Sequence, residues 1–127
     1  DVVATVLPGP SIGLGMQYAP ARKLLDANCC VSIASDWNPG SAPMGNLLTQ
    51  ASILATFEKL SMAEVLSAIT FRAAKALNFS DRGIISEQKI GDFISFSTSD
   101  FRNIIYEQGQ LQPTNVWKDG RLIYTKK

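Results

Sequence analysis

Histidine is absent from this 127-residue sequence, and its absence limits the chemistry that the chain can perform alone. Without an imidazole there is no Ser-His-Asp triad, no Cys-His pair and no histidine metal site within these residues. Cysteine is scarce as well, because only the adjacent Cys29 and Cys30 occur. Neighbouring side chains of a strand point to opposite faces, so these thiols make no disulfide framework, which favours a reducing cytoplasm. Their simplest interpretation is as two small apolar residues near a buried strand.

The sequence also lacks an excess of charge and a long apolar run. Net charge is +1 with Lys and Arg scattered, so nothing favours nucleic acid or an anionic membrane as a partner. We expect no membrane span and no signal peptide, because no segment is apolar for long enough and the start has no basic region. The 46% apolar and 18% charged fractions are typical of a folded soluble domain. An opening in mid-strand without Met suggests a chain cut from a longer one.

Periodicity predicts strands and helices in an order that begins with a strand–helix–strand unit. The predicted segments are a strand at 2–7, a loop at 10–19, a helix at 21–27, a strand at 29–34, helices at 46–59 and 62–77, strands at 83–85, 92–97 and 115–124, and an irregular connector at 99–113. Ser61 and Glu64 predict a capping box, and Asp119-Gly120 predicts a hairpin turn. A strand–helix–strand unit implies parallel strands, and two of them alone leave exposed edges. The sequence therefore predicts an α/β fold, with this piece belonging to a barrel or a doubly wound sheet.

Asp36 is the main candidate for chemistry, because it follows a predicted buried parallel strand and precedes a Gly/Pro loop. In barrel enzymes the catalytic groups lie at that end of the strands. A carboxylate there can ligate a divalent metal and accept a proton from its bound water. Alternatively, Asp36 simply ends the strand and caps a turn. Asn38, Gly40 and Ser41 follow on the same loop, where they could bind a polar substrate or serve as ordinary turn residues.

Five segments resemble those of one enzyme superfamily, in the same order. ASDWNPGSAP (34–43) resembles the S/T-D-x-N-P-G motif that follows a buried strand in imidazolonepropionases, and ATVLPGPSIGLG (4–15) resembles the strand and loop before it. The segments that resemble amidohydrolases in general are LSMAEVLSAITFRAAKAL (60–77), DRGIISEQKIGDFISF (81–96) and NVWKDGRLIY (115–124). Two positions depart from the superfamily pattern, with Gln88 in place of Gly and Gly91 in place of Ala.

The resemblance implies a fold and a reaction. The fold is a metal-dependent (β/α)8 barrel with a small β-sandwich, in which 1–77 would be the last two barrel strands with their helices and 78–127 the C-terminal part of the sandwich. The reaction is hydrolysis of the cyclic amide 4-imidazolone-5-propanoate to N-formimidoyl-L-glutamate in histidine degradation. We therefore expect a cytoplasmic enzyme that acts on a small-molecule substrate and forms a homo-oligomer.

The resemblance also implies roles for single residues. Asp36 matches an aspartate that ligates Zn²⁺ or Fe and serves as the base. Asn38 and Gly40 match residues that hold the formimidoyl-glutamate product, and Ser41 matches the residue that contacts the imidazolone substrate. The histidine ligands would lie upstream of residue 1, so we expect the 127 residues alone to be inactive. Two alternatives remain open, namely a deaminase or hydantoinase of the same superfamily, and a non-catalytic assembly module.

Overall fold

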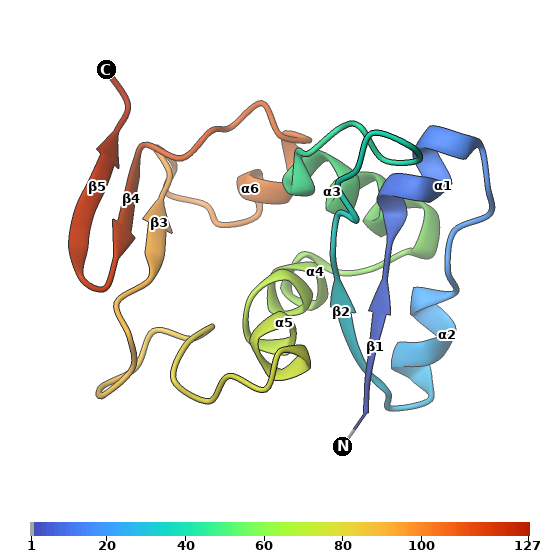
Figure 1. Cartoon of the computed structure of the whole chain (residues 1–127), viewed down its shortest axis with the longest axis horizontal. Helices are drawn as coiled ribbons and strands as arrows, with labels where there is room; N and C mark the ends of the chain where they lie inside the picture. The colour runs from blue at the N-terminus through green and yellow to red at the C-terminus, as the bar shows by residue number, and fades with distance from the viewer. Residues whose placement is uncertain (1) are drawn as a thin grey trace.

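The computed structural model describes residues 2–127, and the first half of the chain is built on two parallel strands. β1 (Val3–Val6) pairs with β2 (Cys30–Ile33) in a register that places Val6 opposite Ile33. Figure 1 shows both strands running from the N-terminal end toward one edge, where α1 and the loop after β2 lie. The parallel pairing predicted from the strand–helix–strand order is confirmed.

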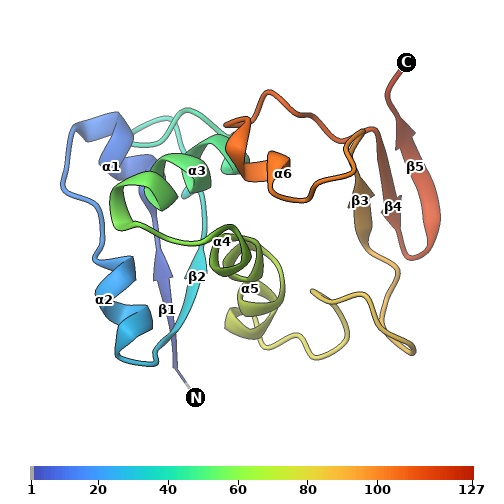
Figure 2. The same cartoon turned by 180° about the vertical axis from the view of Figure 1, so that it is seen from behind.

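Helices accompany these strands through the first half of the chain. They are α1 (Pro8–Leu14), α2 (Ala21–Asp26), α3 (Leu47–Glu58), α4 (Met62–Ile69) and α5 (Phe71–Ala76). α2 packs against β2, and both α4 and α5 pack against β2 from another side, as the two opposite views in Figures 1 and 2 show. One apolar core joins the strands to the helices, and its members include Val6, Val31, Ile33, Leu54, Val65 and Ile105. Burial of each such side chain contributes roughly 1.5–3 kcal/mol.

The second half of the chain carries a separate antiparallel sheet. Its strands, in spatial order, are β3 (Phe93–Ser95), β4 (Asn115–Lys118) and β5 (Arg121–Thr125). The sheet lies on the far side of α5 from β1 and β2 in both views (Figures 1 and 2). Asp119 and Gly120 both take positive φ, 50° and 73°, so the predicted hairpin turn between β4 and β5 is confirmed.

The start of α4 forms as the sequence predicts. The Ser61 hydroxyl accepts from the backbone N–H of Glu64 at 3.3 Å, and the Glu64 carboxylate accepts from the backbone N–H of Ser61 at 2.8 Å. This capping box, together with Arg22 from α2, keeps the pKa of Glu64 below its usual value. Arg22 Nη1 lies 3.0 Å from Glu64 Oε1, so the same carboxylate also ties α2 to α4.

Two helix predictions need correction. The predicted loop at 10–19 is wrong in its first part, because α1 continues to Leu14 from Pro8, and a proline fits the first turn of a helix without losing a hydrogen bond. The predicted helix at 62–77 is interrupted at Thr70, which has φ −122° and ψ −94°. The Thr70 hydroxyl donates to the Leu66 carbonyl oxygen at 2.6 Å and occupies the acceptor that a continuous helix would use.

The predictions between the two halves are wrong in part. No strand forms at 83–85, where Gly83 has φ 88° and the chain turns. Gln88, which stands where the superfamily usually has Gly, takes φ 63°, a left-handed angle. The predicted connector contains a short helix, α6 (Asn103–Tyr106), which packs on α3 and places Ile105 in the core. Among the described residues, no helix is both long enough and apolar enough to cross a bilayer.

Candidate active-site loop

The carboxyl ends of β1 and β2 bring two connecting segments together. β1 leads directly into α1, and β2 leads into a loop that spans 34–46. The pairing continues one step beyond the strands, since the backbone N–H of Ala34 donates to the Val6 carbonyl oxygen at 3.1 Å. Parallel strands end at the same edge of a sheet, and Figure 1 shows α1 beside the loop at that edge.

Two glycines of α1 allow the helix to lie directly against the loop. A Cβ atom on Gly9 would lie 2.2 Å from the Ser35 carbonyl oxygen, and one on Gly13 would lie 2.1 Å from the Ser41 carbonyl oxygen. Residues four apart share one face of a helix, so these glycines form a face without side chains. Sequence reasoning missed this contact, although the Gly-x-x-x-Gly spacing in GPSIG was a signal for it.

Asp36 lies three residues beyond the end of β2 and is exposed at the carboxyl edge of the strands. Its backbone has φ 50°, a left-handed angle that Asp adopts more readily than most residues. Its Oδ2 atom lies 3.4 Å from the amide nitrogen of Asn38. Within the described part of the chain no cation forms an ion pair with Asp36. The carboxylate is therefore available to a ligand.

Asn38 organises the loop through its side-chain amide. Its Oδ1 accepts from the backbone N–H groups of Gly40 and Ser41 at 2.9 and 2.8 Å. Its Nδ2 donates to the Asp36 carbonyl oxygen at 2.6 Å and to the Ser41 hydroxyl at 3.1 Å. The structure thus brings all four predicted site residues, 36, 38, 40 and 41, into one hydrogen-bonded unit.

Trp37 was not among the predicted site residues, yet it fixes the same loop. Its indole Nε1 donates to the Pro43 carbonyl oxygen at 3.1 Å, while 73% of the residue remains exposed. The backbone of Asn38 pairs with Ala42 in an isolated antiparallel bridge, with N–O distances of 3.1 and 3.3 Å. Side-chain and backbone contacts therefore close the loop in the same place.

Comparison with known proteins assigns the family. A model described as "Amidohydrolase family" matches residues 10–123. The chain belongs to the amidohydrolase family. It is similar to the imidazolonepropionase of Deinococcus deserti, with 38% identity over 94% of this chain and 30% of that protein. It is similar to the imidazolonepropionase of Fusobacterium nucleatum as well, with 35% identity over 99% of this chain and 31% of that protein. The resemblance drawn from the sequence motifs is confirmed, and this amidohydrolase chain spans about a third of the length of these relatives.

Solved structures with the same fold support the α/β class. An adenosine deaminase from Xanthomonas campestris with bound zinc matches this amidohydrolase chain with a TM-score of 0.85 and 25% identity, over 95% of this chain and 31% of that one. Atrazine chlorohydrolase from Arthrobacter aurescens, complexed with zinc, matches with a TM-score of 0.74 and 21% identity, over 93% of this chain and 30% of that one. The second likeness concerns the fold alone.

A catalytic zinc site needs more ligands than the described residues group together. Catalytic zinc sites use about three protein ligands, and the described residues hold no group of three or more Cys, Asp or Glu side chains. Asp36 could serve as one ligand, because its carboxylate is exposed, forms no ion pair within the described residues and offers hard oxygen donors. Among the described residues, Asp36 is thus a candidate for a single metal ligand.

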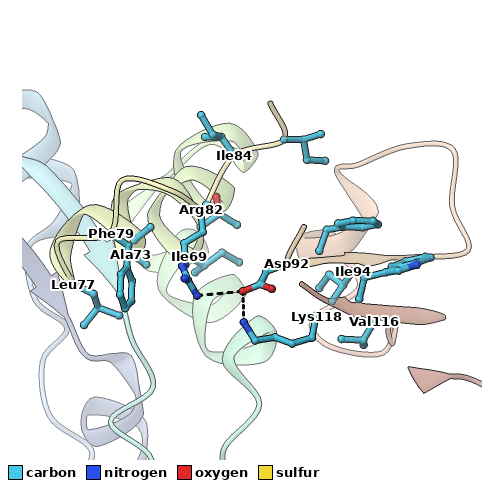
Figure 3. A pocket seen from close by; sticks show the side chains of 16 residues that line it. Ile69, Ala73, Leu77, Phe79, Arg82, Ile84, Asp92, Ile94, Val116 and Lys118 are labelled. Atoms are coloured by element: carbon cyan, nitrogen blue, oxygen red, sulfur yellow. Dashed lines mark hydrogen bonds and ion pairs between the residues drawn. The ribbon is translucent and has the colours of Figure 1, made fainter. Parts of the chain in front are cut away.

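A groove between α5 and the antiparallel sheet is a concave feature of this amidohydrolase chain, with a cavity volume of about 740 Å³. Figure 3 shows Asp92 at the groove between Arg82 and Lys118, at 3.3 and 2.6 Å. The backbone N–H of Asp119, at 2.9 Å, and these two cations keep the pKa of Asp92 below its usual value. The remaining lining is mostly apolar, and none of the four predicted site residues contributes to it. The charged groups of the groove thus pair with one another, whereas Asp36 of the loop forms no ion pair within the described residues, so the loop is the candidate reactive site.

Proposed function

We propose that this chain is the C-terminal part of an amidohydrolase that hydrolyses 4-imidazolone-5-propanoate to N-formimidoyl-L-glutamate in histidine degradation. The observation that carries the proposal is the Asp-x-Asn-Pro-Gly-Ser loop, which is hydrogen-bonded into one unit at the carboxyl edge of two parallel strands. Relatives that match almost the whole chain carry the name imidazolonepropionase. A small-molecule substrate, a cytoplasmic location and a homo-oligomeric state belong to the same proposal.

The two halves of the chain take different parts in this enzyme. Residues 1–77 provide the last two strands of a (β/α)8 barrel with their helices, and 78–127 provide the C-terminal part of a β-sandwich. The parallel pairing of β1 with β2 and the separate antiparallel sheet β3–β5 support this division. A complete barrel needs about 250 residues and eight strands, so the remaining strands come from chain outside these residues.

Asp36 carries the proton transfer in the proposed reaction. Asp36 and ligands outside these residues would hold a divalent Zn²⁺ or Fe ion, which would supply Lewis-acid polarisation of the substrate carbonyl and lower the pKa of water. Asp36 accepts a proton from the water that attacks the ring amide carbon. The same carboxyl group returns the proton to the ring nitrogen as the carbon–nitrogen bond breaks, so that the ring opens.

Asn38, Gly40 and Ser41 orient the substrate and hold the product. Within the free loop the Ser41 hydroxyl and the Asn38 amide bond each other, at 3.1 and 3.3 Å, and a polar ligand can exchange for this contact. Gly40 brings bare backbone to the surface of the loop, because it lacks a side chain. Orientation of this kind lowers the barrier by placing the reacting atoms before the reaction begins.

The test is an assay of the polypeptide encoded by the complete reading frame that contains this chain. We expect turnover of 4-imidazolone-5-propanoate, followed as loss of substrate absorbance and gain of N-formimidoyl-L-glutamate by mass spectrometry. The 127 residues alone should show no turnover. The likeness to an adenosine deaminase structure makes deamination the second candidate, so adenosine and cytosine serve as competing substrates. Ammonia release from either, without ring opening of the imidazolone, would overturn the proposal.

A further inference from the structure

Three consecutive carbonyl groups close the candidate active-site loop, and each accepts a hydrogen bond from a different donor. They belong to residues 42–44. The backbone N–H of Asn38 donates to the first at 3.1 Å, and the indole of Trp37 donates to the second at 3.1 Å. The third accepts from Nε2 of Gln50 at 2.5 Å. The first two donors belong to the loop itself, whereas Gln50 belongs to helix α3.

Gln50 is fully buried, with 0% of the residue exposed. Only one orientation of its amide is compatible with the Met44 carbonyl, since the opposite orientation would place two oxygen atoms against each other. In this orientation Oε1 is buried without a hydrogen-bond partner among the described residues. An unpartnered buried acceptor is destabilising, so stability alone does not explain an amide at this position.

The surroundings of Gln50 connect it to every segment that shapes the loop. Its Nε2 atom lies 3.1 Å from the place that a Cβ atom on Gly9 would occupy, and the same Cβ would meet Ser35 and Ala42. Gln50 therefore lies where α1, the segment after β2 and the end of the loop at Ala42 come together. Movement of α3 relative to the loop would break its bond to Met44.

We propose that Gln50 is a positioning residue, which fixes the loop carrying Asp36, Asn38 and Ser41 by holding the Met44 carbonyl from helix α3. The proposed effect of Gln50 on the order of the loop is argued only from its hydrogen bond to the Met44 carbonyl and from its burial. The effect on substrate rests on the proposed function, because it requires that the loop bind substrate. Without the amide, the end of the loop loses its anchor to the core and the four site residues sample other arrangements.

The test compares Gln50→Met with Ser52→Ala in the complete polypeptide. Gln50→Met keeps the length of the side chain and removes the donor. Ser52 is the matched control, because it is also buried in α3, and its hydroxyl donates to the Thr49 carbonyl within that helix and does not reach the loop. Hydrogen–deuterium exchange of peptides covering 37–45 is the first measurement, and it does not depend on activity.

We expect exchange in 37–45 to accelerate by about tenfold in Gln50→Met and to stay within about twofold in Ser52→Ala. With active enzyme, KM for the imidazolone should rise by about tenfold in Gln50→Met with a smaller change in kcat, and the control should keep both. Gln50→Leu, which also lacks the donor, should behave as Gln50→Met and replaces it if that variant does not fold.

The outcomes separate this inference from the proposed function. Unchanged exchange in 37–45 for both Gln50 variants overturns the inference, whatever the activity. Faster exchange in a polypeptide that has no imidazolone hydrolysis supports the anchor and overturns the proposed function. Faster exchange with unchanged KM in an active enzyme overturns the link between the anchor and substrate binding.

Discussion

Trp37 donates from its indole nitrogen to the Pro43 carbonyl oxygen across 3.1 Å, and so a single side chain spans the loop that presents Asp36. The loop is therefore closed in the free chain, before any substrate is present. Catalytic groups held in place by packing and hydrogen bonds lose little free energy to reorganisation when the substrate arrives.

Replacement of Asp36 by Asn should abolish the chemistry and leave the fold in place. Asn also tolerates the left-handed backbone angle of this position, so the stability of the protein should stay nearly unchanged. We expect kcat/KM for the imidazolone to fall by about 10²–10⁴-fold in the complete polypeptide, because a general base is lost. Asp119→Asn is the matched control, since Asp119 has the same φ of 50° in the hairpin turn. Equal losses in the two variants would contradict the role of Asp36.

Replacement of Gly13 by Ala should destabilise the protein, although Ala is ordinarily the better helix residue by about 0.5–1 kcal/mol. The added Cβ would lie 2.1 Å from the Ser41 carbonyl oxygen, so either α1 or the loop must shift. We expect a loss of about 1–3 kcal/mol in the free energy of unfolding, measured with urea. Ser11→Ala, on the same helix, should stay within about 0.5 kcal/mol. A Gly13→Ala protein more stable than the parent would show that α1 does not pack against the loop.

Replacement of Asn38 by Ala should loosen the loop more than replacement by Asp. Ala leaves the backbone N–H groups of Gly40 and Ser41 without their acceptor, whereas Asp retains an oxygen for both. We expect Asn38→Ala to cost about 1–3 kcal/mol in urea unfolding and Asn38→Asp to cost less. The Asn38→Asp side chain has no N–H group to donate to the Asp36 carbonyl oxygen, so this variant should still lose some stability. The prediction fails if the two variants lose equal stability or if Asp loses more.

The loss of protein stability at acid pH should depend in part on Asp92, in the second half of the chain. The Asp119 N–H and the Lys118 and Arg82 cations lower the pKa of Asp92 below the ordinary 3.8. A depressed folded-state pKa stabilises the protein above the unfolded pKa, and this contribution is lost as the pH falls through the folded value. Asp92→Asn should therefore be less stable at neutral pH and lose less stability below about pH 4.

Urea unfolding at several pH values from about 7 to about 3 measures this difference. Glu87→Gln serves as its control, because Glu87 is exposed and forms no ion pair within the described residues. The control should follow the parent profile throughout. Parallel profiles for Asp92→Asn and the parent protein would show that the cluster in the groove does not contribute to acid stability.

Local sequence signals predicted those parts of the fold that local interactions decide. The Ser61–Glu64 capping box and the Asp119-Gly120 turn each involve residues within a few positions of one another, and both form as predicted. The missed helix α1 contains two glycines, each of which disfavours a helix. Its packing against a loop about thirty residues later compensates, and such a contact between distant segments leaves only a weak local signal. The break at Thr70 depends on the hydroxyl geometry, which periodicity does not report.

The candidate site also combines residues that a local motif predicted with residues that only the folded structure brings to the loop. Asp36, Asn38, Gly40 and Ser41 lie within six residues, so the motif predicted that they would share a loop. Gln50 and the glycine face of α1 reach the loop from other elements. The Gly-x-x-x-Gly spacing in α1 indicates a close contact without naming its partner, and no local pattern marks Gln50 as part of the loop. Their contribution depends on the way in which α3 and α1 pack, which requires the folded arrangement.

The left-handed backbone at Asp36 limits which residues fit this position without strain. Glycine and asparagine fit this angle comfortably, but neither offers a carboxylate, whereas glutamate has the right charge and a less suitable backbone preference. Aspartate offers a carboxylate together with tolerance of this angle, so the main chain at position 36 favours the same residue that the proposed chemistry requires.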